Sequence, residues 1–69
     1  MPNELQSVTN QTALQNSVAL ADYSKAIQLD AKWYHFNGRG TSYHAIDDHK
    51  PALEDFNKAI ELYNEEDEI

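Results

Sequence analysis

Apolar residues recur three and four positions apart in three stretches of the chain, and this spacing is typical of one face of an α-helix. The pattern predicts helices over about 12–30, 33–45 and 49–64. The apolar positions are Leu20, Tyr23 and Ile27 in the first stretch, Phe36 and Tyr43 in the second, and Ala52, Phe56, Ala59, Ile60 and Tyr63 in the third. We therefore expect an all-α fold.

The N-terminal segment, 1–18, has a weaker pattern. It is polar, and Glu4 is its only charged side chain. Leu5, Val8, Leu14 and Val18 are sparsely spaced apolar residues. We interpret the segment as a degenerate helix with a break near Asn10, or as partly disordered.

One phrase occurs twice. Residues 19–29 match residues 52–62, 33 positions later, at seven of eleven positions. A fixed period of this size is typical of stacked repeats. Each repeat covers its apolar face with a neighbour and leaves a surface for binding other molecules. The phrase therefore indicates a function in molecular recognition.

Small and aromatic residues alternate at defined places along 33–63. The predicted helix 33–45 has the order aromatic, small, aromatic, and the predicted helix 49–64 has small, aromatic, small; the residues are Phe36, Gly40, Tyr43, Ala52, Phe56 and Ala59. This arrangement resembles one tetratricopeptide repeat, and Ala19, Tyr23 and Ala26 are similar to the second helix of a preceding repeat. The resemblance implies an antiparallel helix pair, 33–45 and 49–64, preceded by a longer helix, as a fragment of an α-solenoid. The chain departs from the family in its period of 33 instead of about 34 and in Asp47, which replaces a turn glycine.

Tetratricopeptide proteins bind peptides or proteins in a groove lined by their first helices. The resemblance places Tyr34, Asn37, Thr41, His44 and Ala45 on this groove. Trp33 lies beside them at the start of the helix and is an aromatic candidate for contact with a partner. Arg39 is expected to face the neighbouring helix instead, so only Asn37 could join a clamp for the C-terminal carboxylate of a chaperone, and we do not expect that ligand.

Length and charge narrow the class of protein. A chain of 69 residues without cysteine forms one small domain; we place it at 1–64, with 65–69 as an acidic tail. The net charge of −7 argues against nucleic acid and against anionic membranes as partners, because both attract cationic proteins. Neither a membrane-spanning stretch nor a secretory signal is visible, so we expect a cytoplasmic protein.

Few residues of the sequence suggest a metal site or a catalytic site. His35, His44 and His49 lack the helical spacing of paired metal ligands, and no nucleophile motif or phosphate-binding loop is present. We expect no enzyme activity, no metal and no cofactor. The leading hypothesis is a protein-interaction module with a protein or peptide partner. The alternatives are a structural homodimer, for example by exchange of the N-terminal helix, and a small acidic inhibitor that covers a basic site.

Overall fold

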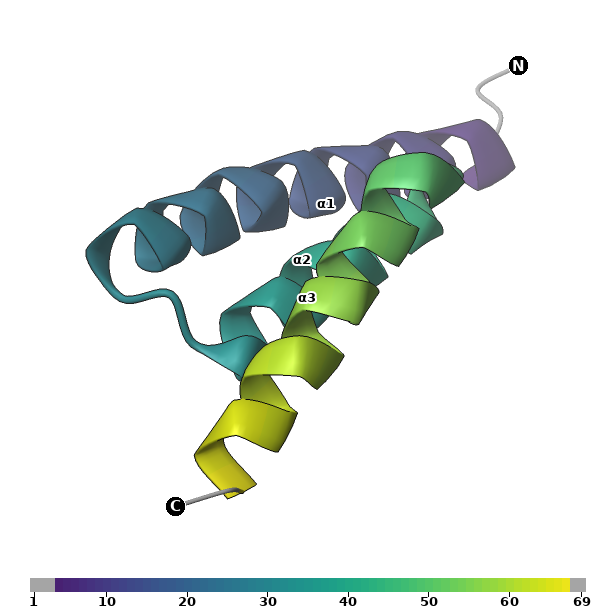
Figure 1. Cartoon of the computed structure of the whole chain (residues 1–69). Coiled ribbons are helices and arrows are strands. Elements are labelled where there is room, and N and C mark those ends of the chain that lie inside the picture. The colour runs from purple at the N-terminus through teal and green to yellow at the C-terminus, as the bar shows by residue number, and fades with distance from the viewer. Residues whose placement is uncertain (1–3, 68–69) are drawn as a thin grey trace.

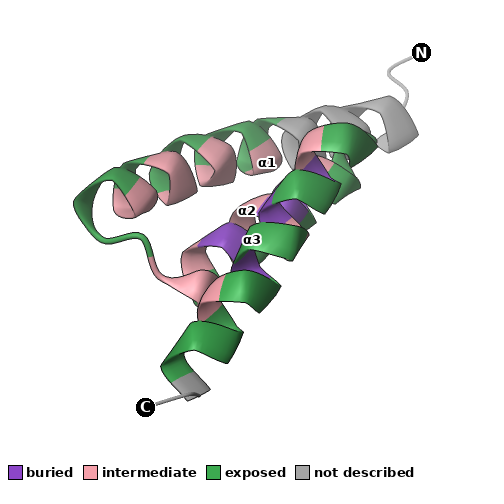
Figure 2. Cartoon of the chain, in the orientation of Figure 1, coloured by how far each residue is buried: buried purple, intermediate pink, exposed green. Residues whose placement is uncertain are grey.

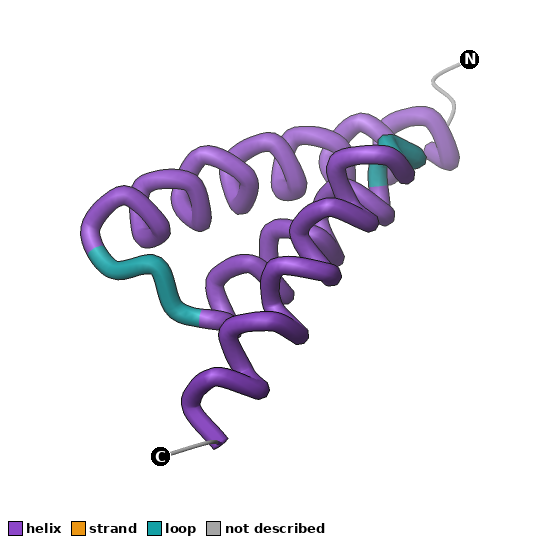
Figure 3. Tube along the Cα trace, in the orientation of Figure 1, coloured by secondary structure: helices purple, strands orange, loops and turns teal. Residues whose placement is uncertain are grey.

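The computed structural model describes the backbone of residues 4–67 and the side chains of residues 14–66. Three helices follow one another in this part of the chain: α1 (Glu4–Leu29), α2 (Trp33–Ala45) and α3 (His49–Asp67). It contains no strand (Figures 1 and 3). The expected all-α fold is confirmed, and α2 has the predicted bounds.

The first helix is longer than the sequence pattern predicted. The expected break near Asn10 is wrong, because α1 runs without interruption from Glu4 to Leu29. This segment contains neither proline nor glycine, the residues that most strongly interrupt a helix. The last helix also continues past 64, so Glu65 and Glu66 are exposed helical residues. The end of the predicted acidic tail, 68–69, lies outside the described residues.

A tight turn reverses the chain between α2 and α3. The amide of Asp48 donates to the carbonyl of Tyr43 (2.9 Å), and the amide of Asp47 donates to that of His44 (3.0 Å). Asp47 has a φ of 69°, the left-handed conformation that usually requires glycine. As a result α2 and α3 run antiparallel and pack against each other (Figure 1).

Two glycines in α2 allow its neighbours to approach. A Cβ atom on Gly40 would lie 2.9 Å from the ring of Phe56 and 3.2 Å from the carbonyl oxygen of Ala52. A Cβ on Gly38 would lie 2.5 Å from the ring of Tyr23 on α1. The sequence pattern includes Gly40 as a small residue between two aromatic ones and assigns no role to Gly38. The structure provides one, because Gly38 accommodates the aromatic ring of the first helix.

The core is thin and centred on α2. Its buried apolar residues are Phe36, Ala52 and Ala59, and no large side chain among the described residues is completely buried (Figure 2). Helix α2 packs against both α1 and α3, whereas the described parts of α1 and α3 do not contact each other. No described helix has the length and apolar character needed to cross a bilayer.

Candidate functional site

An exposed face of α2 carries most of the predicted binding residues. Tyr34, Asn37, Thr41, His44 and Ala45 are all exposed. They lie on one side of the helix, since residues three, four and seven positions apart share a face. Trp33 is half-buried at the start of the helix. The sequence therefore located an accessible face, while its role in binding stays a prediction.

Two side chains of this face, Thr41 and Tyr34, already make contacts that reduce the groups they present to a partner. The hydroxyl of Thr41 donates to the carbonyl of Asn37 at 2.9 Å, so its proton is already used. The ring of Tyr34 lies against those of Trp33 and His35, with centroid distances of 5.7 and 4.6 Å. Tyr34 still keeps 50% of its surface exposed. The aromatic end of α2 is therefore an ordered, accessible surface.

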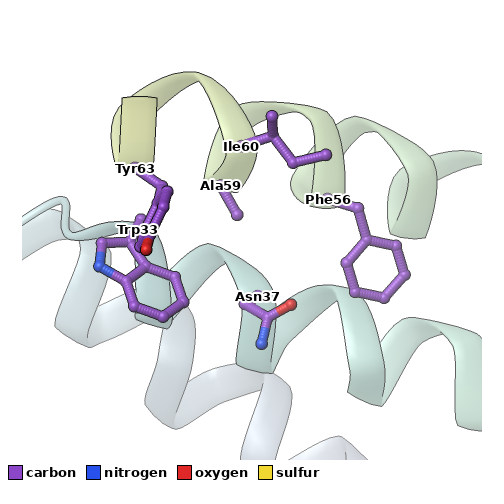
Figure 4. A pocket seen from close by; sticks show the side chains of 6 residues that line it. All are labelled: Trp33, Asn37, Phe56, Ala59, Ile60 and Tyr63. Carbon is purple, nitrogen blue, oxygen red and sulfur yellow. The ribbon is translucent and has the colours of Figure 1, made fainter. Parts of the chain in front are cut away.

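An apolar pocket lies beside this face, between α2 and α3, with a volume of about 350 Å³. Trp33 and Tyr63 meet edge to face at 5.2 Å at one end, and Phe56 stands at the other (Figure 4). The lining residues are Trp33, Asn37, Phe56, Ala59, Ile60 and Tyr63. Asn37 contributes the side-chain amide of this set, and Tyr63 and Trp33 add a hydroxyl and an indole N–H to otherwise apolar walls. The pocket therefore brings together two of the six predicted residues and leaves Tyr34, Thr41, His44 and Ala45 outside.

The sequence did not predict the α3 side of this pocket. Its pattern placed Phe56, Ile60 and Tyr63 in the apolar stripe of the last helix. Ile60 and Tyr63 remain 59% and 52% exposed. Helix α2 reaches the level of Tyr63, because its first residue, Trp33, contacts the Tyr63 ring. Ile60 is exposed because it lies about 100° around the helix from the buried Ala59.

The α2–α3 turn holds a polar cluster of His44, Asp47 and His49. The Nδ1 atoms of the two histidines are 3.2 Å apart, and Nε2 of His49 is 2.7 Å from a carboxylate oxygen of Asp47. Since the carboxylate accepts the Nε2 proton of His49, a neutral His49 accepts from Nδ1–H of His44. Among the described residues, no group of three or more histidine, aspartate or glutamate side chains is arranged to hold a metal ion.

An ion pair connects the three helices. The guanidinium of Arg39 donates two hydrogen bonds of 2.8 Å to Asp55 on α3 and one of 3.3 Å to the hydroxyl of Ser24 on α1. The hydrogen bond to Asp55 raises the pKa of Arg39 above its usual value, against the lowering effect of burial. The expectation that Arg39 faces a neighbouring helix is confirmed. The Asp55 carboxylate is thereby engaged in structure and is not available as a catalytic base.

Comparisons of this chain with models of protein families, with curated proteins and with solved structures give no match.

Proposed function

We propose that this chain is a non-enzymatic protein-interaction module of the tetratricopeptide type, which binds a peptide or protein segment along the exposed face of α2. The observation that carries the proposal is the position of this face. Its neighbours α1 and α3 occupy other sides of α2, and an accessible aromatic and polar surface remains beside the apolar pocket.

The chemistry of the surface suits a polypeptide ligand. The pocket can receive one apolar side chain, and the amide of Asn37, which both donates and accepts hydrogen bonds, can bind a peptide group at its edge. Tyr34 offers a rigid aromatic surface of the kind that anchors interfaces. The net charge of −7 favours a neutral or basic segment over nucleic acid or an anionic membrane.

The test begins with partners captured by the full chain and then measures affinity for a purified partner. We expect Tyr34→Ala and Asn37→Ala to weaken binding by about tenfold or more each, the effect of removing an interface anchor. Leu29→Ala is the matched control, because Leu29 is 78% exposed on α1, away from the pocket. Circular dichroism checks that every variant is folded. Unchanged affinity in the two α2 variants would refute the proposal.

Removal of residues 65–69 separates this function from the acidic-inhibitor alternative. Binding along α2 predicts little change in affinity, because Glu65 and Glu66 do not line the pocket. An inhibitor that depends on its acidic end would lose its partner.

A further inference from the structure

Helix α3 carries an apolar stripe that α2 covers only in part: Phe56 packs on Gly40 and Tyr63 on Trp33, whereas Leu53 and Ile60 remain exposed. Leu53, Phe56, Ile60 and Tyr63 are spaced three, four and three residues apart, which is the a and d spacing of a coiled-coil seam. Phe56 is half-buried, whereas Leu53, Ile60 and Tyr63 are 62%, 59% and 52% exposed. Figure 2 shows much of α3 as exposed, and Figure 4 shows three residues of the stripe, Phe56, Ile60 and Tyr63, on the α3 side of the pocket.

The repeated segment, 19–29 in α1 and 52–62 in α3, shows how these positions pack when a neighbouring helix lies beside them. Leu20 and Ile27 of α1 correspond to Leu53 and Ile60 of α3, 33 positions later. Both are half-buried, and α2 is the helix that α1 contacts. The same side chains in the same phrase are therefore covered in α1 and exposed in α3. The α3 stripe has the composition of a helix-packing face without its helix.

The stripe shares Phe56, Ile60 and Tyr63 with the pocket. We propose that a second copy of this chain covers the stripe when the pocket holds no peptide, with the two α3 helices antiparallel about a twofold axis at the level of Lys58. The spacing of the stripe is symmetric about this residue. An antiparallel pair therefore places Leu53 opposite Tyr63 of the second copy and Phe56 opposite its Ile60. These are the mixed a–d layers of an antiparallel coiled coil, and an isologous contact of this kind closes as a dimer.

The residues beside the stripe permit self-pairing in spite of the net charge of −7. On one side the flanking positions are Asn57 and Asn64, which are exposed and uncharged. On the other side Ala52 and Ala59 are buried and uncharged. The exposed carboxylates of Glu54 and Glu61 lie at the next positions around the helix, away from the seam. Like charges therefore do not meet at the centre of the contact.

Charge at the helix ends selects the antiparallel orientation. A parallel pair would bring the acidic C-terminal ends of both α3 helices together, including Glu65 and Glu66 of each copy. The antiparallel pair separates them and brings each acidic end to the level of Lys50 near the start of the other α3. The positive end of the helix dipole lies there as well.

The seam is short, so the dimer is weak. From Leu53 to Tyr63 the stripe extends about 15 Å, and stable interfaces bury about 800 Å² on each partner. We therefore expect association at micromolar concentrations. Sedimentation equilibrium from about 10 μM to about 1 mM should show the mass rising from 7.9 kDa towards twice that value.

A charge in the seam should abolish association. We expect Ile60→Asp to remain a monomer over this range, while Leu29→Asp, the same kind of change at an exposed leucine outside the seam, should associate like the parent chain. Tyr34→Ala should also associate normally, so failure of this inference is distinguishable from failure of the proposed function. A parent chain that stays monomeric would overturn the second-copy proposal and leave the stripe for a different protein. Equal association of Ile60→Asp and the parent would overturn it too.

Cysteine cross-linking tests the orientation, because the chain contains no cysteine of its own. An oxidised mixture of Leu53→Cys and Tyr63→Cys chains should form the mixed disulfide. Leu53→Cys alone should not cross-link, because its two thiols would lie about 15 Å apart along the seam. Efficient cross-linking of Leu53→Cys with itself would overturn the antiparallel arrangement.

Discussion

Replacing Arg39 with methionine removes the guanidinium that holds the buried Asp55 carboxylate while keeping an apolar stem. Nε and Nη2 of Arg39 each lie 2.8 Å from one carboxylate oxygen of Asp55. The side chains of Arg39 and Asp55 are 22% and 7% exposed. A buried carboxylate without its donors keeps the full cost of lost hydration. We therefore expect Arg39→Met to be among the most destabilising substitutions in the chain.

The magnitude follows from the unequal burial of the two groups. Removing one partner of a buried ion pair costs about 3–5 kcal/mol, and partial exposure of this pair favours the lower end, about 3 kcal/mol for Arg39→Met. Asp55→Asn leaves the guanidinium charge of Arg39, which is the more accessible partner, and should lower the free energy of unfolding by about 1–2 kcal/mol. A domain of this length is stable by about 3–10 kcal/mol in total. Arg39→Met should therefore remove a large share of the stability.

The assay is urea unfolding, followed by helical circular dichroism and by Trp33 fluorescence. The double variant Arg39→Met/Asp55→Leu replaces the pair by apolar side chains, and a buried pair replaced in this way is often neutral. It should therefore be more stable than Arg39→Met alone. A cost below about 1 kcal/mol for Arg39→Met, or a double variant no more stable than that single variant, would refute the view that this pair connects the helices.

Further predictions concern the turn, the helix contact and pH. Gly40→Ala should lower stability by about 1–2 kcal/mol, since crowding of Phe56 outweighs the gain of about 1 kcal/mol in helix propensity; urea unfolding measures it. Asp47→Gly should raise stability by about 0.5–1 kcal/mol, because glycine adopts a φ of 69° without strain and this gain outweighs the loss of the exposed contact between Asp47 and His49; a lower melting temperature would contradict this. Folding raises the pKa of Arg39, so its contribution to the free energy of unfolding is complete below the unfolded pKa and is lost only as pH rises through the folded pKa. The difference in free energy of unfolding between the parent chain and Arg39→Met should therefore be constant from about pH 6 to about pH 9.

The sequence predicted what local periodicity controls. Helical spacing and the turn residues gave three helices, the bounds of α2 and the glycine contact at Gly40, because these depend on neighbours close in the chain. The contact of Tyr23 with Gly38 depends on how α1 crosses α2, and no local pattern encodes that angle. The burial of Asp55 also depends on how the helices pack, and the sequence did not predict it because an aspartate in a helix usually occupies a solvent-exposed position. The α3 wall of the pocket exists because Ile60 lies about 100° around the helix from the buried Ala59 and remains exposed beside α2.

The described parts of α1 and α3 do not contact each other, and this has a consequence for cooperativity. With α2 as the shared neighbour, the free energy of the fold divides into two interfaces, as in a one-dimensional array of coupled units. Opening the α1 interface exposes Tyr23 and breaks the bond of Arg39 to Ser24, but it leaves the bonds to Asp55 in place. The described chain can therefore unfold in steps. Backbone amide hydrogens of α1 should exchange with solvent through a local opening, whereas those of the α2–α3 pair should exchange only through global unfolding.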